Sequence, residues 1–247
     1  LIILLAWFWT SPVLAESDSI VWRRADGPWG GAIRALAIDP QKPNIVYAGT
    51  TCGVYQSNDS GGNWTQVGAG EISCQEIRSL AIDPADPQIV YAVGSEGIFR
   101  TNDRGGAWTR IDRGFTGQSV SALALDPARR GVLYVAAQGT IWVSADYGRH
   151  WTATDAPFRG EIVWTLAVDL SDSERLYAGT HKGLYLSEDS GKTWGLAPAA
   201  PQVSVRSVAS GLGDPRHLYI ATDQGLWESP DSGATWQALD AQETLAA

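Results

Sequence analysis

The segment SNDSGGNW, from Ser57 to Trp64, decides the fold of this chain. Its pattern of Ser or Thr, then Asp, Gly and Trp at fixed spacing, recurs four more times. The other copies are TNDRGGAW from Thr101, SADYGRHW from Ser144, SEDSGKTW from Ser187 and SPDSGATW from Ser229. The five aspartates, Asp59, Asp103, Asp146, Asp189 and Asp231, are separated by 44, 43, 43 and 42 residues. Such a constant interval indicates tandem structural repeats.

Each repeat carries two further motifs in a fixed order. In the first repeat they are AIDPQKPNIVYAGT, from Ala37, and the unit Gly53-Val54-Tyr55. Runs rich in β-branched and aromatic residues, bounded by Gly, Asn, Asp and Pro, predict strands A to D over 35–39, 45–49, 54–57 and 64–67. Four short strands in ~40–45 residues are typical of a β-propeller blade. The sequence therefore predicts an all-β propeller of four-stranded antiparallel blades, five in number.

The recurring Asp, Gly and Trp have a structural explanation within each blade. The carboxylate accepts hydrogen bonds from backbone N–H groups of a tight turn, and the Gly two positions later permits a positive φ. The Trp anchors the outer strand by burying apolar surface; these residues are Trp64, Trp108, Trp151, Trp194 and Trp236. A catalytic or calcium-binding role is the alternative, but each turn supplies one Asp and the turns lie far apart on the rim. We predict no catalytic residue, no metal and no cofactor.

The repeat resembles a known family. Its residues match the Asp box, or bacterial neuraminidase repeat, of β-propellers, and the match covers Trp22 to Trp236. The Asp-Pro and Val-Tyr-Ala-Gly-Thr elements look most like those of exported sortilin-like and xyloglucanase-like repeat proteins, and they are similar to photosystem II assembly-factor propellers. The resemblance implies the fold; because one propeller fold carries many functions, it implies the function far less directly.

The first fifteen residues differ from the rest of the chain. Leu1 to Trp9 form an unbroken apolar run, followed by Pro12 and the small-residue pattern that ends at Ala15. This pattern is typical of a secretory signal peptide, and an uncleaved membrane anchor is the alternative. The apolar run is shorter than the ~20 residues that a membrane span needs. We expect a signal peptide over 1–15, one propeller domain over 16–247 and an exported protein.

The charge balance excludes one class of partner. The chain has 27 acidic and 18 basic residues, a formal net charge of −9, and no basic run. An anionic surface of this kind argues against binding of nucleic acid or of an anionic membrane. We expect the mature domain to be monomeric and not to insert into a membrane.

The number of blades leaves two alternatives open. Trp22 lies 42 residues before Trp64 and so occupies a strand D position without an Asp box. Its strand, over 19–24, is surplus to five complete repeats. Either five blades close into a ring with an extra outer strand, or the sequence is a piece of a larger propeller.

The face formed by the B–C and D–A loops is the candidate binding surface. Its D–A loops vary among the repeats, whereas the Asp boxes and Asp-Pro turns lie on the opposite face. Just before strand A, the repeats carry Arg34, Arg78, Ser121, Trp164 and Arg206. If the ring closes, the three arginines form a basic arc at the channel mouth, facing Trp164. Guanidinium groups bind carboxylates or phosphates in bidentate fashion.

Two more residues, Trp29 and Glu161, complete the candidate site. Trp29 lies near Trp164 in this arrangement, and the two rings are suited to stacking on a sugar or an aromatic group. Glu161 lies on the same face. The alternative is that the arginines are packing residues bonded to neighbouring loops and to Glu71, Glu76 or Glu161. Cys52, in a B–C loop, and Cys74, in the next D–A loop, are predicted to form a disulfide; two separate thiols are the alternative.

Two functions follow from these features. The first is a non-catalytic module, a scaffold or assembly factor, that binds a protein or glycan through the B–C/D–A face. The second is a glycoside hydrolase of sialidase-like type, because such enzymes use an arginine cluster. The start of the chain lacks the Phe-Arg-Ile-Pro element common in those enzymes, and no pair of carboxylates is clearly placed for hydrolysis. We therefore favour the binding module.

Overall fold

The structure is a computed structural model that describes residues 27–68, 70, 72–112, 119–155, 157–158, 161–211 and 214–239. These residues form twenty strands and no helix, so the described part of the chain contains no helix that is long and apolar enough to span a membrane. The predicted signal peptide over 1–15, the strand expected over 19–24 with Trp22, and Glu71 lie outside the described residues.

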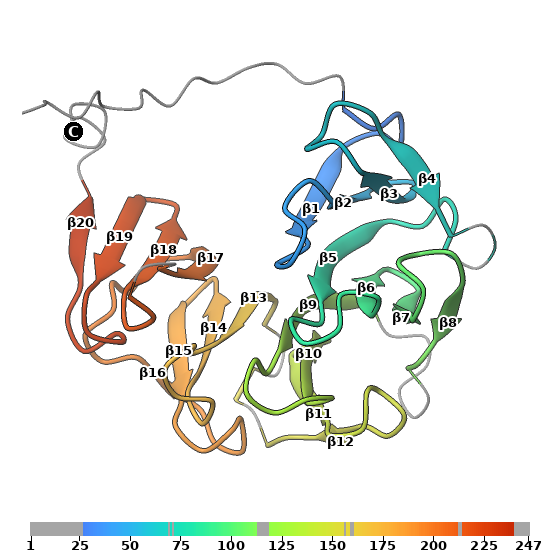
Figure 1. Cartoon of the computed structure of the whole chain (residues 1–247). Helices are drawn as coiled ribbons and strands as arrows, with labels where there is room; N and C mark the ends of the chain where they lie inside the picture. The colour runs from blue at the N-terminus through green and yellow to red at the C-terminus, as the bar shows by residue number, and fades with distance from the viewer. Residues whose placement is uncertain are drawn as a thin grey trace, which may run out of the picture.

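The strands form five separate antiparallel sheets of four consecutive strands each (Figure 1). The first blade contains β1 (Ile33–Ile38), β2 (Val46–Thr50), β3 (Gly53–Ser57) and β4 (Thr65–Val67). The second contains β5 (Ile77–Ile82), β6 (Val90–Gly94), β7 (Gly97–Thr101) and β8 (Trp108–Arg110). The third contains β9 (Val120–Leu125), β10 (Leu133–Ala137), β11 (Thr140–Ser144) and β12 (Thr152–Ala153). The fourth contains β13 (Val163–Val168), β14 (Leu176–Thr180), β15 (Gly183–Ser187) and β16 (Gly195–Leu196). The fifth contains β17 (Val205–Ser210), β18 (Leu218–Thr222), β19 (Gly225–Ser229) and β20 (Gln237–Leu239). The predicted propeller of four-stranded antiparallel blades is therefore confirmed.

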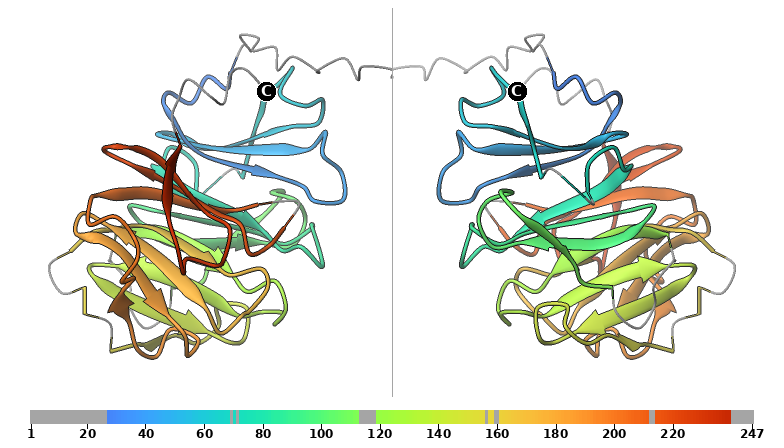
Figure 2. Two further views of the ribbon diagram at one scale, coloured as in Figure 1. Left: turned by 90° about the vertical axis from the view of Figure 1, so that its left-hand side faces the viewer. Right: turned by 90° about the vertical axis from the view of Figure 1, so that its right-hand side faces the viewer.

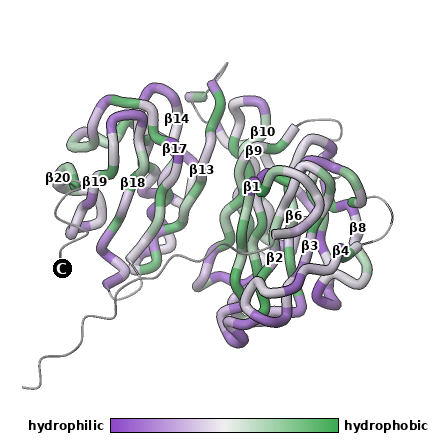
Figure 3. Tube along the Cα trace, turned by 90° about the horizontal axis from the view of Figure 1, so that it is seen from above, coloured by the Kyte–Doolittle hydropathy of each residue, from purple (hydrophilic) through white to green (hydrophobic). Residues whose placement is uncertain are grey.

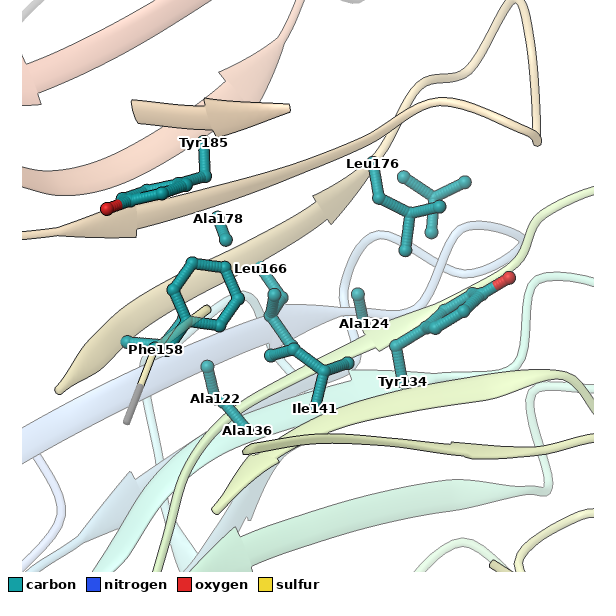
Figure 4. Close-up of a cluster of buried hydrophobic side chains, with 12 residues drawn as sticks. Ala122, Ala124, Tyr134, Ala136, Ile141, Phe158, Leu166, Leu176, Ala178 and Tyr185 are labelled. Atoms are coloured by element: carbon teal, nitrogen blue, oxygen red, sulfur yellow. The ribbon is translucent and has the colours of Figure 1, made fainter. Parts of the chain in front are cut away.

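The blades are held together by apolar side chains sandwiched between neighbouring sheets. Four clusters join the first blade to the second, the second to the third, the third to the fourth and the fourth to the fifth. Between the third and fourth blades, Tyr134, Ile141, Phe158, Leu166 and Leu176 interdigitate (Figure 4). Phe158 comes from the D–A loop and meets Tyr185 edge to face at 4.8 Å. A blade thus buries its two faces only when it has two neighbours.

The arrangement of the blades is an open ring. The strand A positions, β1, β5, β9, β13 and β17, lie innermost, and an opening separates the first blade from the fifth (Figure 1). From above, β17 to β20 stand apart from β1 to β4 (Figure 3). The side views show the first blade stacked on the second at one end of the open ring (Figure 2). No apolar cluster among the described residues joins the fifth blade to the first.

Each Asp box is built on one hydroxyl and one carboxylate. In the fourth blade the Ser187 hydroxyl donates to Oδ1 of Asp189 at 2.9 Å and accepts the N–H of Gly191. Oδ1 also accepts the Thr193 N–H, and the Trp194 indole N–H donates to the Gly191 carbonyl oxygen. The hydroxyl–carboxylate pair is present in all five boxes, from Ser57 and Asp59 to Ser229 and Asp231. Each Asp box therefore supplies hydrogen-bond partners for the backbone groups of its own turn.

Acid should weaken these boxes. Hydrogen bonds from the Asn63 side chain and backbone, and from Ser57, lower the pKa of Asp59 to about 2. The carboxylate is thus favoured in the folded chain relative to the unfolded one, where the pKa of Asp is about 3.9. The stabilisation is complete above about pH 4 and is lost as the pH falls towards 2. We expect urea unfolding midpoints to fall across this range, and to fall less in the Asp59→Asn variant; equal slopes in both proteins would contradict the prediction.

Candidate functional site

The five residues predicted at the entrance to strand A share a backbone feature. In every blade the register between strands A and B shifts at this residue: Arg34, Arg78, Ser121, Trp164 or Arg206. A β-bulge leaves one residue unpaired and redirects its side chain. The propeller therefore presents one bulged residue per blade at the inner end of the B–C/D–A face. The sequence located these residues but gave no sign of the bulges.

Two of the bulged arginines share one carboxylate. Nε of Arg34 lies 3.5 Å from Oε1 of Glu76, and an Nη of Arg78 lies 3.0 Å from Oε2. Arg78 also donates to the Ser119 hydroxyl, in the next D–A loop. The Arg34 and Arg78 side chains remain 53% and 37% exposed. Two guanidinium groups thus share a single counter-charge and keep a net positive charge at the surface.

Arg206 and Trp164 form a second group. The Arg206 guanidinium lies 3.7 Å from the centre of the Trp164 ring, a cation–π contact, and the His181 ring meets the same indole edge to face, with 6.4 Å between the ring centres. No contact between the described residues joins this group to Arg34 and Arg78. The ring is open between the fifth and first blades, so the arc expected for a closed ring is divided into two groups. Arg206 stacks on Trp164 rather than facing it across the mouth.

The remaining candidates lie apart from both groups. Trp29 is 94% exposed, in the segment before β1, and packs on neither Trp164 nor an arginine. Glu161 is 6% exposed and pairs through Oε1 with Lys182 of the next B–C loop. Its Oε2 atom is buried without a hydrogen bond in the described part of the structure. Glu161 thus joins the third and fourth blades.

Lys182, His181 and Ser119 are contacts that the sequence analysis missed. Lys182 and His181 stand in a two-residue B–C turn, between the recurring Gly-Thr and Gly-Leu-Tyr motifs. Residues of these B–C turns contact the D–A loops on either side, as Lys182 does with Glu161 and Cys52 with Cys74, and their position in the repeat was the available signal.

The two cysteines face each other. The B–C loop of the first blade carries Cys52 and the following D–A loop carries Cys74, and the two Sγ atoms lie next to each other. No free cysteine remains among the described residues. The side chains would link two loops that are 22 residues apart.

We expect the protein purified without reductant to contain the Cys52–Cys74 disulfide and to lose about 2–4 kcal/mol of stability on reduction, because a cross-link restricts the unfolded chain. Mass spectrometry of the unreduced protein after alkylation should detect no free thiol, and urea unfolding with and without reductant gives the stability change. The Cys52→Ser/Cys74→Ser variant is the control, since reductant should leave its stability unchanged. Two alkylated thiols in the native protein would contradict the prediction.

Comparisons with known proteins agree with this architecture. Residues 96–196 match the family model of sortilin, neurotensin receptor 3. A search of curated proteins finds no match. An ancestral GH74 enzyme superposes with a TM-score of 0.69 at 18% identity, over 85% of this chain and 31% of that one. The GH74 xyloglucanase from Xanthomonas campestris gives 0.67 at 20%, over 84% and 39%.

A smaller propeller is also similar. YCF48 bound to D1 peptide superposes with a TM-score of 0.61 at 18% identity, over 87% of this chain and 68% of that one. This chain spans less than two fifths of the GH74 chains in these comparisons. At these identities the superpositions establish the fold alone. The chain forms a propeller of five four-stranded blades with five Asp boxes, and it is similar to the sortilin family model over residues 96–196 and, in fold, to YCF48.

Proposed function

We propose that this protein is a non-catalytic, exported propeller that binds a partner protein through the B–C/D–A face. The observation that carries the proposal is the pair of bulged arginines, Arg34 and Arg78, held side by side on Glu76. The pair keeps an excess positive charge on a chain whose formal net charge is −9. The net negative charge of the protein repels anionic surfaces at long range, whereas the local cationic site attracts an acidic group that comes close to it.

The chemistry of the site favours an acidic, extended segment. Each exposed guanidinium group offers N–H donors to a carboxylate, and bidentate pairs of this kind are strong and directional. The Trp164–Arg206 stack adds a flat surface on which a peptide group or an aromatic side chain packs. A chain that crosses the face meets both groups. The neighbour YCF48 is a propeller solved with a bound peptide, D1, which makes a protein partner the first choice over a glycan.

Peptide binding tests the proposal. We expect an immobilised library of Glu- and Asp-rich peptides to be retained in a salt-dependent manner, and the matching Gln and Asn peptides not to be retained. The Arg34→Ala/Arg78→Ala variant should bind at least about tenfold more weakly, a loss of about 1.4 kcal/mol. Arg149→Ala, an exposed arginine in an Asp box on the opposite face, is the matched control. Equal binding by both variants would refute the proposed site.

The sialidase-like hydrolase remains the alternative, and similarity to GH74 folds favours testing it. Among the described acids on this face, Glu76 is engaged by Arg34 and Arg78 and Glu161 by Lys182. Hydrolysis needs two carboxyl groups about 5–10 Å apart around a sugar. A panel of sialosides and polysaccharides decides the question: turnover that disappears in the Glu161→Gln variant would support the enzyme.

A further inference from the structure

At three of the four internal interfaces, a long polar side chain of one blade reaches the Asp box of the next. The acceptor is always the carbonyl oxygen of the residue that follows the box Asp. The pairs are Gln56 with Arg104, Arg100 with Tyr147 and Arg175 with Ser232, each with 3.5 Å between donor and acceptor. The side chain comes from the fourth residue of strand C in the first two pairs and from the residue before strand B in the last.

The interface between the third and fourth blades lacks this contact. Val143 is the fourth residue of β11, and Val132 directly precedes β10, so valine stands at both positions that carry the long side chains elsewhere. Valine has no hydrogen-bond donor in its side chain. The described residues place no donor on the carbonyl oxygen of Ser190, which follows the box Asp of the fourth blade. This carbonyl oxygen is therefore open to a donor from outside the chain.

A hollow of about 460 Å³ lies between these two blades. Apolar groups make up much of its lining: Val132, Val143, Ala145, Ala153 and the Tyr134 ring. A hollow of about 450 Å³ at the first interface is lined instead by the amides of Gln56, Asn58 and Gln66. The third interface thus offers the same room without an amide side chain of its own.

The charged groups around the hollow restrict what can enter it. The Arg129 guanidinium is held by the buried Asp126 carboxylate, with 2.6 Å between Nε and Oδ2, and it also donates to the Ser190 hydroxyl. Lys192 and Asp155 line the hollow, are exposed and form no ion pair with a described residue. Arg129 and Lys192 disfavour a second cation, and a carboxylate brings no N–H group for the Ser190 carbonyl oxygen. A neutral amide has both a donor and an acceptor and meets neither obstacle.

We propose that the hollow between the third and fourth blades binds a glutamine side chain of an extended peptide. The methylene groups of the glutamine lie against the apolar lining, and its amide N–H donates to the Ser190 carbonyl oxygen. Its amide oxygen accepts a hydrogen bond from Lys192. The first interface contains the internal counterpart of this arrangement, since the amide of Gln56 donates to the Arg104 carbonyl oxygen.

The backbone of such a peptide has a place beside the hollow. β12 is the outermost strand of the third blade and pairs only with β11 (Figure 1). Its two residues, Thr152 and Ala153, are exposed and line the hollow. A peptide that adds to this free edge directs alternate side chains to the side of the hollow. The site shares no residue with the pair Arg34 and Arg78, so it does not depend on the function proposed above.

Peptide titrations followed by NMR test the proposal on the intact, ¹⁵N-labelled protein. The probe is Ser-Thr-Val-Gln-Val-Thr-Ser, compared with peptides that have Glu, Arg or Ala at the centre. We expect saturable shifts of the amides at 152–155 and 190–192, and at least about tenfold tighter binding of the Gln peptide than of the other three. Equal binding of all four peptides, tighter binding of the Arg or Glu peptide, or no shift up to the solubility limit of the Gln peptide would overturn the proposal.

A variant that fills the hollow from within supplies the second test. In Val143→Gln the new amide should bond to Ser190 as Gln56 does to Arg104. We therefore expect at least about tenfold weaker binding of the Gln peptide and an unchanged or higher melting temperature. Leu186→Gln, at the same strand C position of the fourth blade, is the control and should bind as the parent protein does. If Val143→Gln does not fold, Val143→Leu fills the same space. A folded filling variant that binds the Gln peptide as tightly as the control sinks the proposal.

Discussion

Replacing Leu166 by Ala is expected to lower the free energy of unfolding by about 2–5 kcal/mol. Leu166 lies on β13, is 7% exposed and packs with Ile141, Phe158 and Leu176 between the third and fourth blades (Figure 4). Truncation removes buried methyl groups and leaves a cavity that rigid sheets on both sides cannot fill. Urea unfolding followed by tryptophan fluorescence measures the change, because Trp194 borders the same cluster.

The chain supplies its own control for this substitution. Leu36 occupies the equivalent position on β1 but is 62% exposed, so we expect Leu36→Ala to change stability by less than about 0.5 kcal/mol. The two variants have the same chemistry and the same strand position, and they differ in whether a preceding blade is present. Equal losses for both would mean that Leu36 is covered in solution.

Replacing Gly94 by Ala should be still more disruptive. Gly94 ends β6, and a Cβ atom there would lie 1.9 Å from the Glu76 carbonyl oxygen and 3.3 Å from the Ile77 Cα atom. Both are backbone atoms, so strand β5 has to move as a unit, and we expect a loss of about 3 kcal/mol or more. The substitution displaces Glu76, which pairs with Arg34 and Arg78. The molecules that still fold should therefore also bind acidic peptides more weakly.

A second glycine isolates the cause. Gly195, on β16, has no atom within 4 Å of the corresponding Cβ position, so Gly195→Ala should be neutral or stabilise the protein by up to about 1 kcal/mol. Circular dichroism melts of the two variants give the comparison. A tolerated Gly94→Ala would show that the β5–β6 contact is looser than the structure has it.

The strands were predictable because the same pattern of apolar runs and turn residues recurs in five repeats. Strand boundaries differ from expectation by one or two residues: β1 begins at Ile33 rather than Ala35, and β4 begins at Thr65, after Trp64. The backbone of the Asp box was predicted in part. In each Asp box, the glycine two positions after the Asp has a positive φ, as expected. The residue between the Asp and this glycine also has a positive φ; Arg104 and Tyr147 are examples. Side chains other than glycine adopt this conformation when surrounding hydrogen bonds impose it, and composition alone does not reveal that.

The candidate site was predictable by position but not by pairing. The period of the repeat placed Arg34, Arg78, Trp164 and Arg206 at one level of the propeller. Their partners depend on how far each blade turns relative to the next and on whether the ring closes, and neither is encoded within a single repeat. The sequence named Glu76 only as one of three possible partners, with Glu71 and Glu161. That Arg34 and Arg78 share it, and that Arg206 stacks on Trp164, is visible only in three dimensions.

The bulges make the identity of the residue at this position independent of the demands of folding. In each blade the bulged side chain leaves the pleat, while the residues on either side resume their pairing with strand B. Arginine, serine and tryptophan accordingly occupy one and the same position without disturbing a ladder or an apolar core. On the proposed binding rim, the five bulged positions can therefore be substituted one at a time, to accept a different ligand, with little effect on strand pairing or on the apolar core.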